Sequence, residues 1–277
     1  MLRAYSRTEG TPTFKIALID GPVARDHPSL TNAPITELAV PSDSNSASPS
    51  RRHATFMASI LVGQSDEVVG LCPACTVLSL PAVDDDMVTG RTSARETAQR
   101  IAACVGRAVE ADADLVVLSL EFAPRQQQAF QIVADAIARA AARGVRTVLP
   151  AGNQSSLDPG LVAAAPGAVP VALGYDNGLV HPRATLGMAI AQRGLLAPGV
   201  DIPGALSTGG YALRSGSSFS AALVAGAAGL LSGLLPRATR DDIWRILLDQ
   251  AGTSPRFSPF VPRTLDLERG LSHWANY

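Results

Sequence analysis

Short apolar runs alternate along this chain with longer segments in which apolar residues recur every three or four positions. The short runs are almost continuously apolar, which is typical of strands buried on both faces of a parallel sheet. The longer segments have the spacing of amphipathic helices. The pattern therefore predicts βαβ units in an α/β fold, a single-domain three-layer arrangement with a mostly parallel sheet and helices on both faces.

The expected elements are spread over nearly the whole chain. Strands are predicted at Phe14–Asp20, Val77–Val83, Leu115–Leu120, Val145–Leu149 and Val169–Leu173. Helices are predicted at Ala54–Leu61, Ser93–Glu110, Gln127–Arg143, Ser218 to about Leu235, and Arg240–Gln250. Since neither a repeat nor a long linker divides the chain, we expect one domain over residues 14–277, preceded by an N-terminal tail of residues 1–13.

Two polar segments interrupt this pattern. Residues 41–50 are almost all Ser, Pro, Asp and Asn, which predicts an exposed, mobile loop directly before His53. The run Asp84-Asp85-Asp86 is the main acidic cluster. It lacks the spaced oxygen ligands of a calcium loop, so we expect a solvated turn there.

Composition limits the possible partners and compartments. The 277 residues are 47% apolar and 17% charged, with a net charge of −1, so nothing draws the whole chain towards nucleic acid or anionic membrane. No stretch reaches the roughly 20 apolar residues of a membrane span, and no apolar signal segment lies near Met1. We expect a cytoplasmic protein without nucleic-acid or membrane partners, and the oligomeric state stays open.

The three cysteines are Cys72, Cys75 and Cys104, and the first two form a C-x-x-C motif. A structural zinc site needs four ligands, and the remaining Cys and the four His are scattered. A redox motif is expected at a helix N-terminus, whereas this one precedes the strand-like run from Thr76. We therefore expect structural thiols or one local disulfide, with no metal and no cofactor.

Four polar residues stand where an α/β sheet exposes catalytic groups. Asp20 ends the first strand, Asn153 follows the strand at 145–149, His53 is expected to open a helix, and Ser218 begins the long apolar helix. Each has an ordinary explanation as a turn former, surface residue or helix cap. Together they supply what a serine nucleophile needs, namely an imidazole base, a carboxylate that orients it and a donor for the oxyanion.

The segments around these residues resemble the signature blocks of the subtilisin-like serine peptidases, or subtilases, in which the triad also runs in the order Asp, His, Ser. The resemblance implies that Asp20, His53 and Ser218 form the triad and that Asn153 completes the oxyanion hole. It further implies a substrate-lining set of Ser119, Leu120, Glu121, Phe122, Ala151 and Gly152. The matching blocks are Ile16–Asp20, His53–Thr55, Val117–Leu120, Ala151–Asn153 and Gly216–Ala221.

Within that family the chain is most similar to the cyanobactin maturation proteases, through the segments 20–23, 27–30 and 72–76. This resemblance implies a serine endopeptidase whose partner is a ribosomally synthesised precursor peptide. The interval between the Asp and His blocks is mostly the polar segment 41–50, without the helical insert of the macrocyclising members. Hydrolysis is therefore favoured over transpeptidation.

Some positions depart from the family pattern. Ala54 replaces a Gly, Ser217 replaces a Thr, and Glu121 and Phe122 replace small residues beside the S1 cleft. Glu121 could favour a basic substrate side chain or simply narrow the pocket. These departures motivate an alternative, a catalytically weak or inactive pseudo-peptidase that binds peptides. An α/β-hydrolase esterase would need a histidine after the serine, where only His273 remains.

Overall fold

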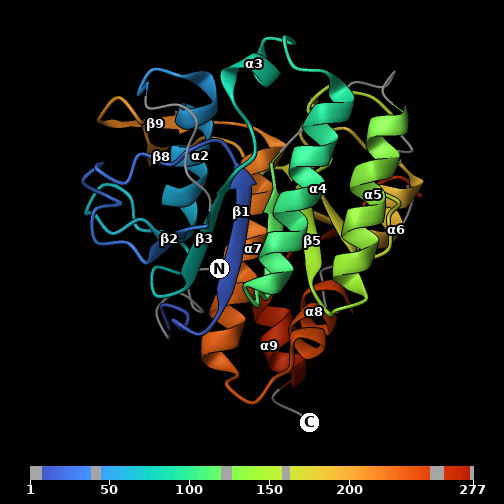
Figure 1. The fold of residues 1–277 in the computed structure, drawn as a ribbon. Helices are drawn as coiled ribbons and strands as arrows, with labels where there is room; N and C mark the ends of the chain where they lie inside the picture. Colours follow the sequence, from blue (N-terminus) through green and yellow to red (C-terminus); the bar gives the residue numbers. More distant parts are fainter. Residues whose placement is uncertain (1–7, 39–44, 120–126, 158–162, 250–258, 275–277) are drawn as a thin grey trace.

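The computed structural model describes residues 8–38, 45–119, 127–157, 163–249 and 259–274 (Figure 1). Its strands are β1 (Lys15–Asp20), β2 (Ile35–Glu37), β3 (Thr76–Pro81), β4 (Leu115–Leu118), β5 (Arg146–Pro150), β6 (Ala168–Gly174), β7 (Leu195–Pro198), β8 (Ile202–Ala205), β9 (Tyr211–Arg214) and β10 (Arg263–Thr264). Its helices are α2 (Pro49–Val62), α3 (Asp85–Val88), α4 (Ala94–Glu110), α5 (Gln127–Ala141), α6 (Met188–Arg193), α7 (Ser217–Leu234), α8 (Arg240–Asp249) and α9 (Leu267–Trp274).

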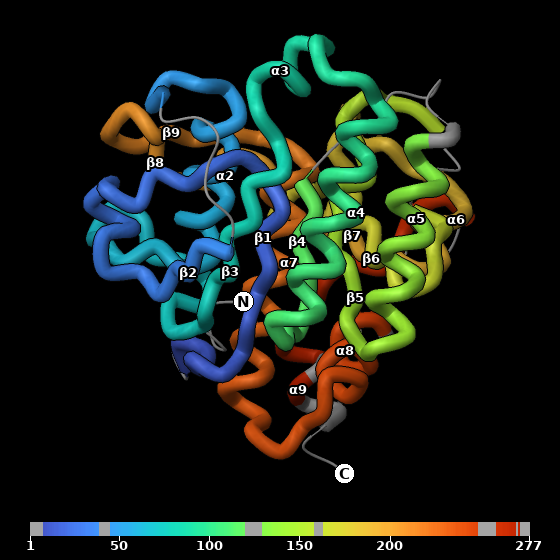
Figure 2. Tube along the Cα trace, in the orientation of Figure 1, coloured from blue at the N-terminus to red at the C-terminus, as the bar shows by residue number. Residues whose placement is uncertain are grey.

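Eight of the described strands form one sheet in the order β10-β7-β6-β5-β4-β1-β3-β2, and every neighbouring pair in it is parallel. The labels of β2, β3, β1, β4 and β5 follow one another across the view in Figure 2. Helices α4 and α5 lie in front of the sheet and α7 lies behind it (Figure 1). The predicted three-layer α/β fold is confirmed.

The alternation of side chains along β1 explains why both faces of the sheet are covered. Ile16 and Leu18 point into a core shared with α2 and α7, whereas Ala17 and Ile19 point into a second core shared with α4 and α5. All four side chains are buried. Because an apolar residue stands at every one of these positions, neither face of the strand could be left in water.

Helix α2 begins earlier than the pattern of apolar residues predicts. Ser48 caps the helix by accepting a hydrogen bond from the Arg51 N–H, and Pro49 occupies its first position, where a missing N–H costs nothing. Ser48 and Ser50 are buried, so the expectation of an exposed loop over residues 41–50 is wrong at its C-terminal end. Of that loop, residues 41–44 lie outside the described residues. His53 consequently lies in the second turn of α2 and does not open the helix.

The acidic run is also more ordered than expected. Asp84 caps the short helix α3 by accepting a hydrogen bond from the Met87 N–H at 2.9 Å, so the predicted turn is one turn of helix, and none of its residues is buried. The strands β2, β7 and β10 were not predicted, because two to four residues are too few to display a period.

The cysteines and helix α7 belong to the interior. Cys72, Cys75 and Cys104 are buried free thiols, and Cys72 and Cys75 precede β3, as expected. Among the described helices, α7 alone is long and apolar enough to cross a membrane, but 72% of it is buried inside the protein. That burial is typical of a core helix.

In the segment expected to be a tail, residues 1–13, the Glu9 carbonyl accepts a hydrogen bond from the Ala74 N–H at 3.0 Å. The domain boundaries themselves remain a prediction.

Candidate active site

Sheet topology brings the expected site residues to one edge. Asp20 ends β1, Ser119 follows β4, and Ala151 to Asn153 follow β5. Strand β4 lies between β1 and β5, and all three are parallel, so their carboxyl ends share an edge. Helices α2 and α7 pack into the same core and carry His53 and Ser218.

Asp20 and His53 are joined directly. Asp20 Oδ2 lies 2.8 Å from His53 Nδ1, and Asp20 Oδ1 accepts a hydrogen bond from the Gly21 N–H at 2.7 Å. Asp20 is only 2% exposed, whereas the His53 side chain is 31% exposed. A carboxylate oxygen accepts, so Nδ1 carries the proton and Nε2 of the neutral imidazole is left as the base.

Ser218 is held near His53 through its neighbour in α7. The Phe219 ring stacks on the His53 imidazole with centroids 6.0 Å apart and planes at 30°, and it also contacts the Phe56 ring, with centroids 4.8 Å apart. Ser218 precedes Phe219 and is partly exposed. The nucleophile candidate therefore lies in the first turn of α7, next in sequence to the residue that stacks on the imidazole, and it is within reach of solvent.

Two donors for an oxyanion meet at the same helix start. Asn153 Oδ1 accepts a hydrogen bond from the Ser217 N–H at 2.9 Å, which makes Nδ2 the donor end of that side chain. The backbone N–H groups of Ser217, Phe219 and Ser220 have acceptors, but within the described residues that of Ser218 has none. The first N–H groups of a helix have no partner within the helix, and such groups favour negative charge.

The turn that carries Asn153 requires glycine at position 152. Gly152 has φ +117°, and a Cβ there would lie 2.5 Å from Gln154 Oε1 and 2.8 Å from Thr185 Oγ1. The Thr185 hydroxyl donates to Gln154 Oε1 at 2.9 Å, and the Thr185 N–H donates to the Gly152 carbonyl at 3.2 Å. Thr185 thus supports the turn from a loop 31 residues away, and no motif around it pointed to this role.

The two departures nearest the triad fit the interior. Ala54 is fully buried, and Ser217 is fully buried with its hydroxyl accepting a hydrogen bond from the Gly152 N–H at 3.3 Å. The third motif residue of the histidine block, Thr55, accepts from the Ala24 N–H at 3.0 Å and so ties α2 to the loop after β1. Neither departure disturbs the arrangement of Asp20 and His53.

The expected substrate-lining residues divide into two groups. Ser119 is 7% exposed, and its hydroxyl has no hydrogen-bond partner among the described residues. Ala151 is partly exposed and Gly152 is buried. Leu120, Glu121 and Phe122 lie outside the described residues, so their part in specificity stays a prediction.

No group of three or more His, Cys, Asp or Glu side chains in the described ranges is arranged to hold a metal ion.

The comparison with known sequences agrees with the resemblance that the short motifs of the chain indicated. Residues 11–265 match the model of the Subtilase family. Subtilisin amylosacchariticus from Bacillus subtilis subsp. amylosacchariticus is 27% identical over 233 residues, which covers 83% of this chain and 58% of that protein. The chain therefore spans less than two thirds of the length of that relative.

Solved structures extend the likeness to nearly the whole chain. The patellamide maturation protease PatA is 27% identical, with a TM-score of 0.80 over 96% of this chain and 98% of its own. The prenylagaramide maturation protease PagA is 25% identical, with a TM-score of 0.81 over 98% of this chain and 97% of its own. The fold of this chain therefore agrees with theirs over nearly its whole length.

Proposed function

The chain belongs to the subtilase family, and from this premise we propose that it is a serine endopeptidase with Ser218 as its nucleophile. The observation that carries the proposal is the 2.8 Å contact between Asp20 Oδ2 and His53 Nδ1, beside the start of α7. A serine at that position needs a base, and an imidazole oriented by a buried carboxylate is the base that the site offers.

The chemistry follows from the positions of these groups. His53 Nε2 takes the proton from Ser218 Oγ as that oxygen attacks the scissile carbonyl carbon. The oxyanion accepts hydrogen bonds from Asn153 Nδ2 and the Ser218 N–H. The imidazolium, stabilised by Asp20, then protonates the leaving amine. Water, activated by the same imidazole, hydrolyses the acyl-enzyme and releases Ser218.

We propose a ribosomally synthesised precursor peptide as the substrate. The similarity to PatA and PagA, both named as maturation proteases, supports this choice. A peptide would bind as an extended strand along the segments that follow β4 and β5.

We propose the cytoplasm as the compartment, and the three buried free thiols support this assignment because thiols persist in reducing surroundings.

The test is covalent labelling followed by cleavage. A fluorophosphonate probe is expected to add one adduct to native protein, mapped to Ser218 by peptide mass spectrometry, and Ser218→Ala is expected to remain unlabelled. Ser220→Ala is the matched control, because Ser220 lies in the same helix and donates only to the Ala197 carbonyl. It is expected to be labelled as the wild type is.

Folded protein that takes up no probe would contradict the proposal and favour the alternative, a peptide-binding protein without turnover. A library of unmodified peptides then locates the cut sites by mass spectrometry, with Ser218→Ala as the blank. Cuts after Arg or Lys would support the role suggested for Glu121. Cuts after small apolar residues would contradict that role while leaving the triad in place.

A further inference from the structure

The first turn of α2 is attached to a carboxylate from another part of the chain. Asp85 Oδ1 accepts hydrogen bonds from Ser48 Oγ at 2.8 Å, Ser50 Oγ at 3.0 Å and the Ser50 N–H at 3.3 Å. Ser48 is the N-cap of α2, and His53 follows Ser50 by three residues, one turn further along. A single oxygen thus satisfies three donors at the start of the helix that carries the imidazole.

The segment that leads to Asp85 is attached to Asp20. The N–H groups of Ala82 and Val83 both donate to the Asp20 carbonyl, at 2.9 and 3.0 Å. On the other side, a Cβ on Gly21 would lie 2.4 Å from the Ser50 carbonyl oxygen, so these two backbones are in close contact. Hydrogen bonds and the backbone between them therefore form a closed path from Asp20 through residues 82–85 and the start of α2 to His53 and back.

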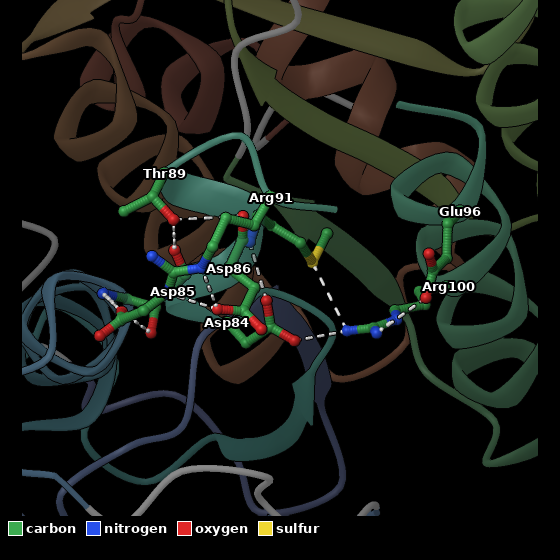
Figure 3. A network of polar contacts seen from close by, with 9 residues as sticks. Asp84, Asp85, Asp86, Thr89, Arg91, Glu96 and Arg100 are labelled. Atoms are coloured by element: carbon green, nitrogen blue, oxygen red, sulfur yellow. Dashed lines mark hydrogen bonds and ion pairs between the residues drawn. The ribbon is translucent and has the colours of Figure 1, made fainter. Parts of the chain in front are cut away.

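The other two acidic residues of the run face different groups (Figure 3). Asp84 contacts the Arg100 guanidinium of α4, and Asp86 contacts that of Arg91. Of the three carboxylates, that of Asp85 alone contacts α2 within the described part of the chain. In Figure 1, α3 lies beyond the end of the sheet at which β3 finishes, and the parallel strand β1 ends at the same edge with Asp20 paired to Pro81.

We infer that Asp85 is a positioning residue that fixes the first turn of α2 against Asp20 and so sets the orientation of the His53 imidazole. This inference rests on the proposed peptidase function. Its basis is geometric, since an imidazole that must serve both Asp20 and Ser218 tolerates little displacement. A misplacement of about 1 Å can cost about 10²-fold in rate.

The ionisation of Asp85 agrees with this role. Burial raises the pKa of the Asp85 carboxyl, but the hydrogen bonds from Ser48 and Ser50 and the charge of Arg91 outweigh it and hold the pKa below its usual range. The carboxylate is therefore ionised at neutral pH. Because its pKa is lower in the folded state, its contribution is present above the unfolded pKa of about 3.9 and is lost as pH falls through the folded value.

The test compares two neighbouring carboxylates. Asp85→Ala is expected to lower kcat by about 10- to 100-fold with KM changed less than about twofold, because the substrate cleft is left in place. Asp85→Asn keeps an acceptor oxygen and is expected to recover most of the rate. Asp86→Ala is the control, since Asp86 contacts Arg91 and not α2, and it is expected to match the wild type.

The pH profile separates positioning from simple loss of folded protein. The rate deficit of Asp85→Ala is expected to be constant from about pH 6 to about pH 9, because the lowered pKa keeps wild-type Asp85 ionised throughout that range. Ser50→Ala removes one hydroxyl donor from the opposite side and tests the same contact if Asp85→Ala fails to fold. In the double variant the two kcat losses are expected to be less than additive.

A folded Asp85→Ala variant with wild-type kcat, or one in which only KM changes, overturns the inference. So does a loss equal to that of Asp86→Ala. These results differ from failure of the proposed function, in which wild-type protein itself takes up no fluorophosphonate and cleaves no peptide.

Discussion

At the scale of single residues, the candidate site depends on which atom of each polar side chain already makes a hydrogen bond within the protein. Asn153 Oδ1 accepts from the Ser217 N–H, and the Ser217 hydroxyl accepts from the Gly152 N–H. The contact at Oδ1 sets which end of the Asn153 amide faces the Ser217 N–H and leaves Nδ2 as its donor end. A donor that is oriented before the reaction needs no reorganisation when negative charge develops.

Replacing Asn153 with Ala is expected to reduce kcat by about 10²–10³-fold with little change in KM, a magnitude that comes from subtilisin itself. Steady-state kinetics on a cleaved peptide provide the measurement. Asn177→Ala is the matched control, because Asn177 is an exposed turn residue whose side chain accepts from the Leu179 N–H. Equal losses of kcat in both variants would mean that Asn153 contributes only through the structure of its turn and not as a donor to the oxyanion.

At the scale of elements, helix α7 performs two tasks at once. Its first turn presents Ser218 to solvent, while the rest of the helix passes through the core behind the sheet. Small residues permit that passage. A Cβ on Gly229 would lie 2.7 Å from Cys75 Sγ and 2.9 Å from Cys72 Sγ. Gly229 therefore provides close packing against the C-x-x-C segment, at the cost of intrinsic helix propensity.

Gly229→Ala is expected to destabilise the protein by about 1–3 kcal/mol, because the added methyl group overpacks the core. Gly106→Ala in α4 is the control, since Gly106 also lies within a helix but a Cβ there meets nothing within 4 Å. It is expected to stabilise the protein by about 0.5–1 kcal/mol through helix propensity. Chemical denaturation followed by circular dichroism measures both, and the same sign for the two variants would contradict this account of packing.

At the scale of the whole molecule, one sheet joins two helical layers, and the cysteines report on both. Cys72 and Cys75 lie in the core shared with α2 and α7, and Cys104 lies in the core shared with α4 and α5. Burial raises the pKa of the Cys104 thiol. The hydrogen bond to Cys75, together with burial, raises the pKa of Cys72, and the same hydrogen bond lowers the pKa of Cys75.

We expect all three thiols to resist Ellman's reagent in the native protein, Cys75 included, because the backbones of Gly10 and Gly229 cover its sulfur. With increasing guanidinium chloride, all three are expected to become reactive over one range of concentration, since a single sheet holds both layers. Mass spectrometry of quenched samples assigns each site. Reaction of Cys104 well before Cys72 and Cys75 would indicate two separately unfolding units and contradict the single-domain prediction.

Apolar periodicity and short motifs were sufficient to predict the central strands, the long helices and the order of the catalytic blocks. Each of these features is local. A continuous apolar run specifies a buried strand such as β1, and a small-residue block before an apolar helix marks the start of α7. The position of Asp20 at the end of a strand could be inferred for the same reason, because residues 14–20 contain the whole signal.

The tertiary structure alone decided the contacts that join distant segments. Asp85 meets Ser48 and Ser50 across 35 or more residues, and Thr185 supports a turn 31 residues away. Such pairs have no periodic signal, because their partners are brought together only when the sheet forms. Residues 14–20, 53–55, 151–153 and 216–221 were therefore sufficient by themselves to predict the chemistry. The contact of Asp85 with Ser48 and Ser50, which no local pattern signals, decided how the start of α2 is held beside Asp20.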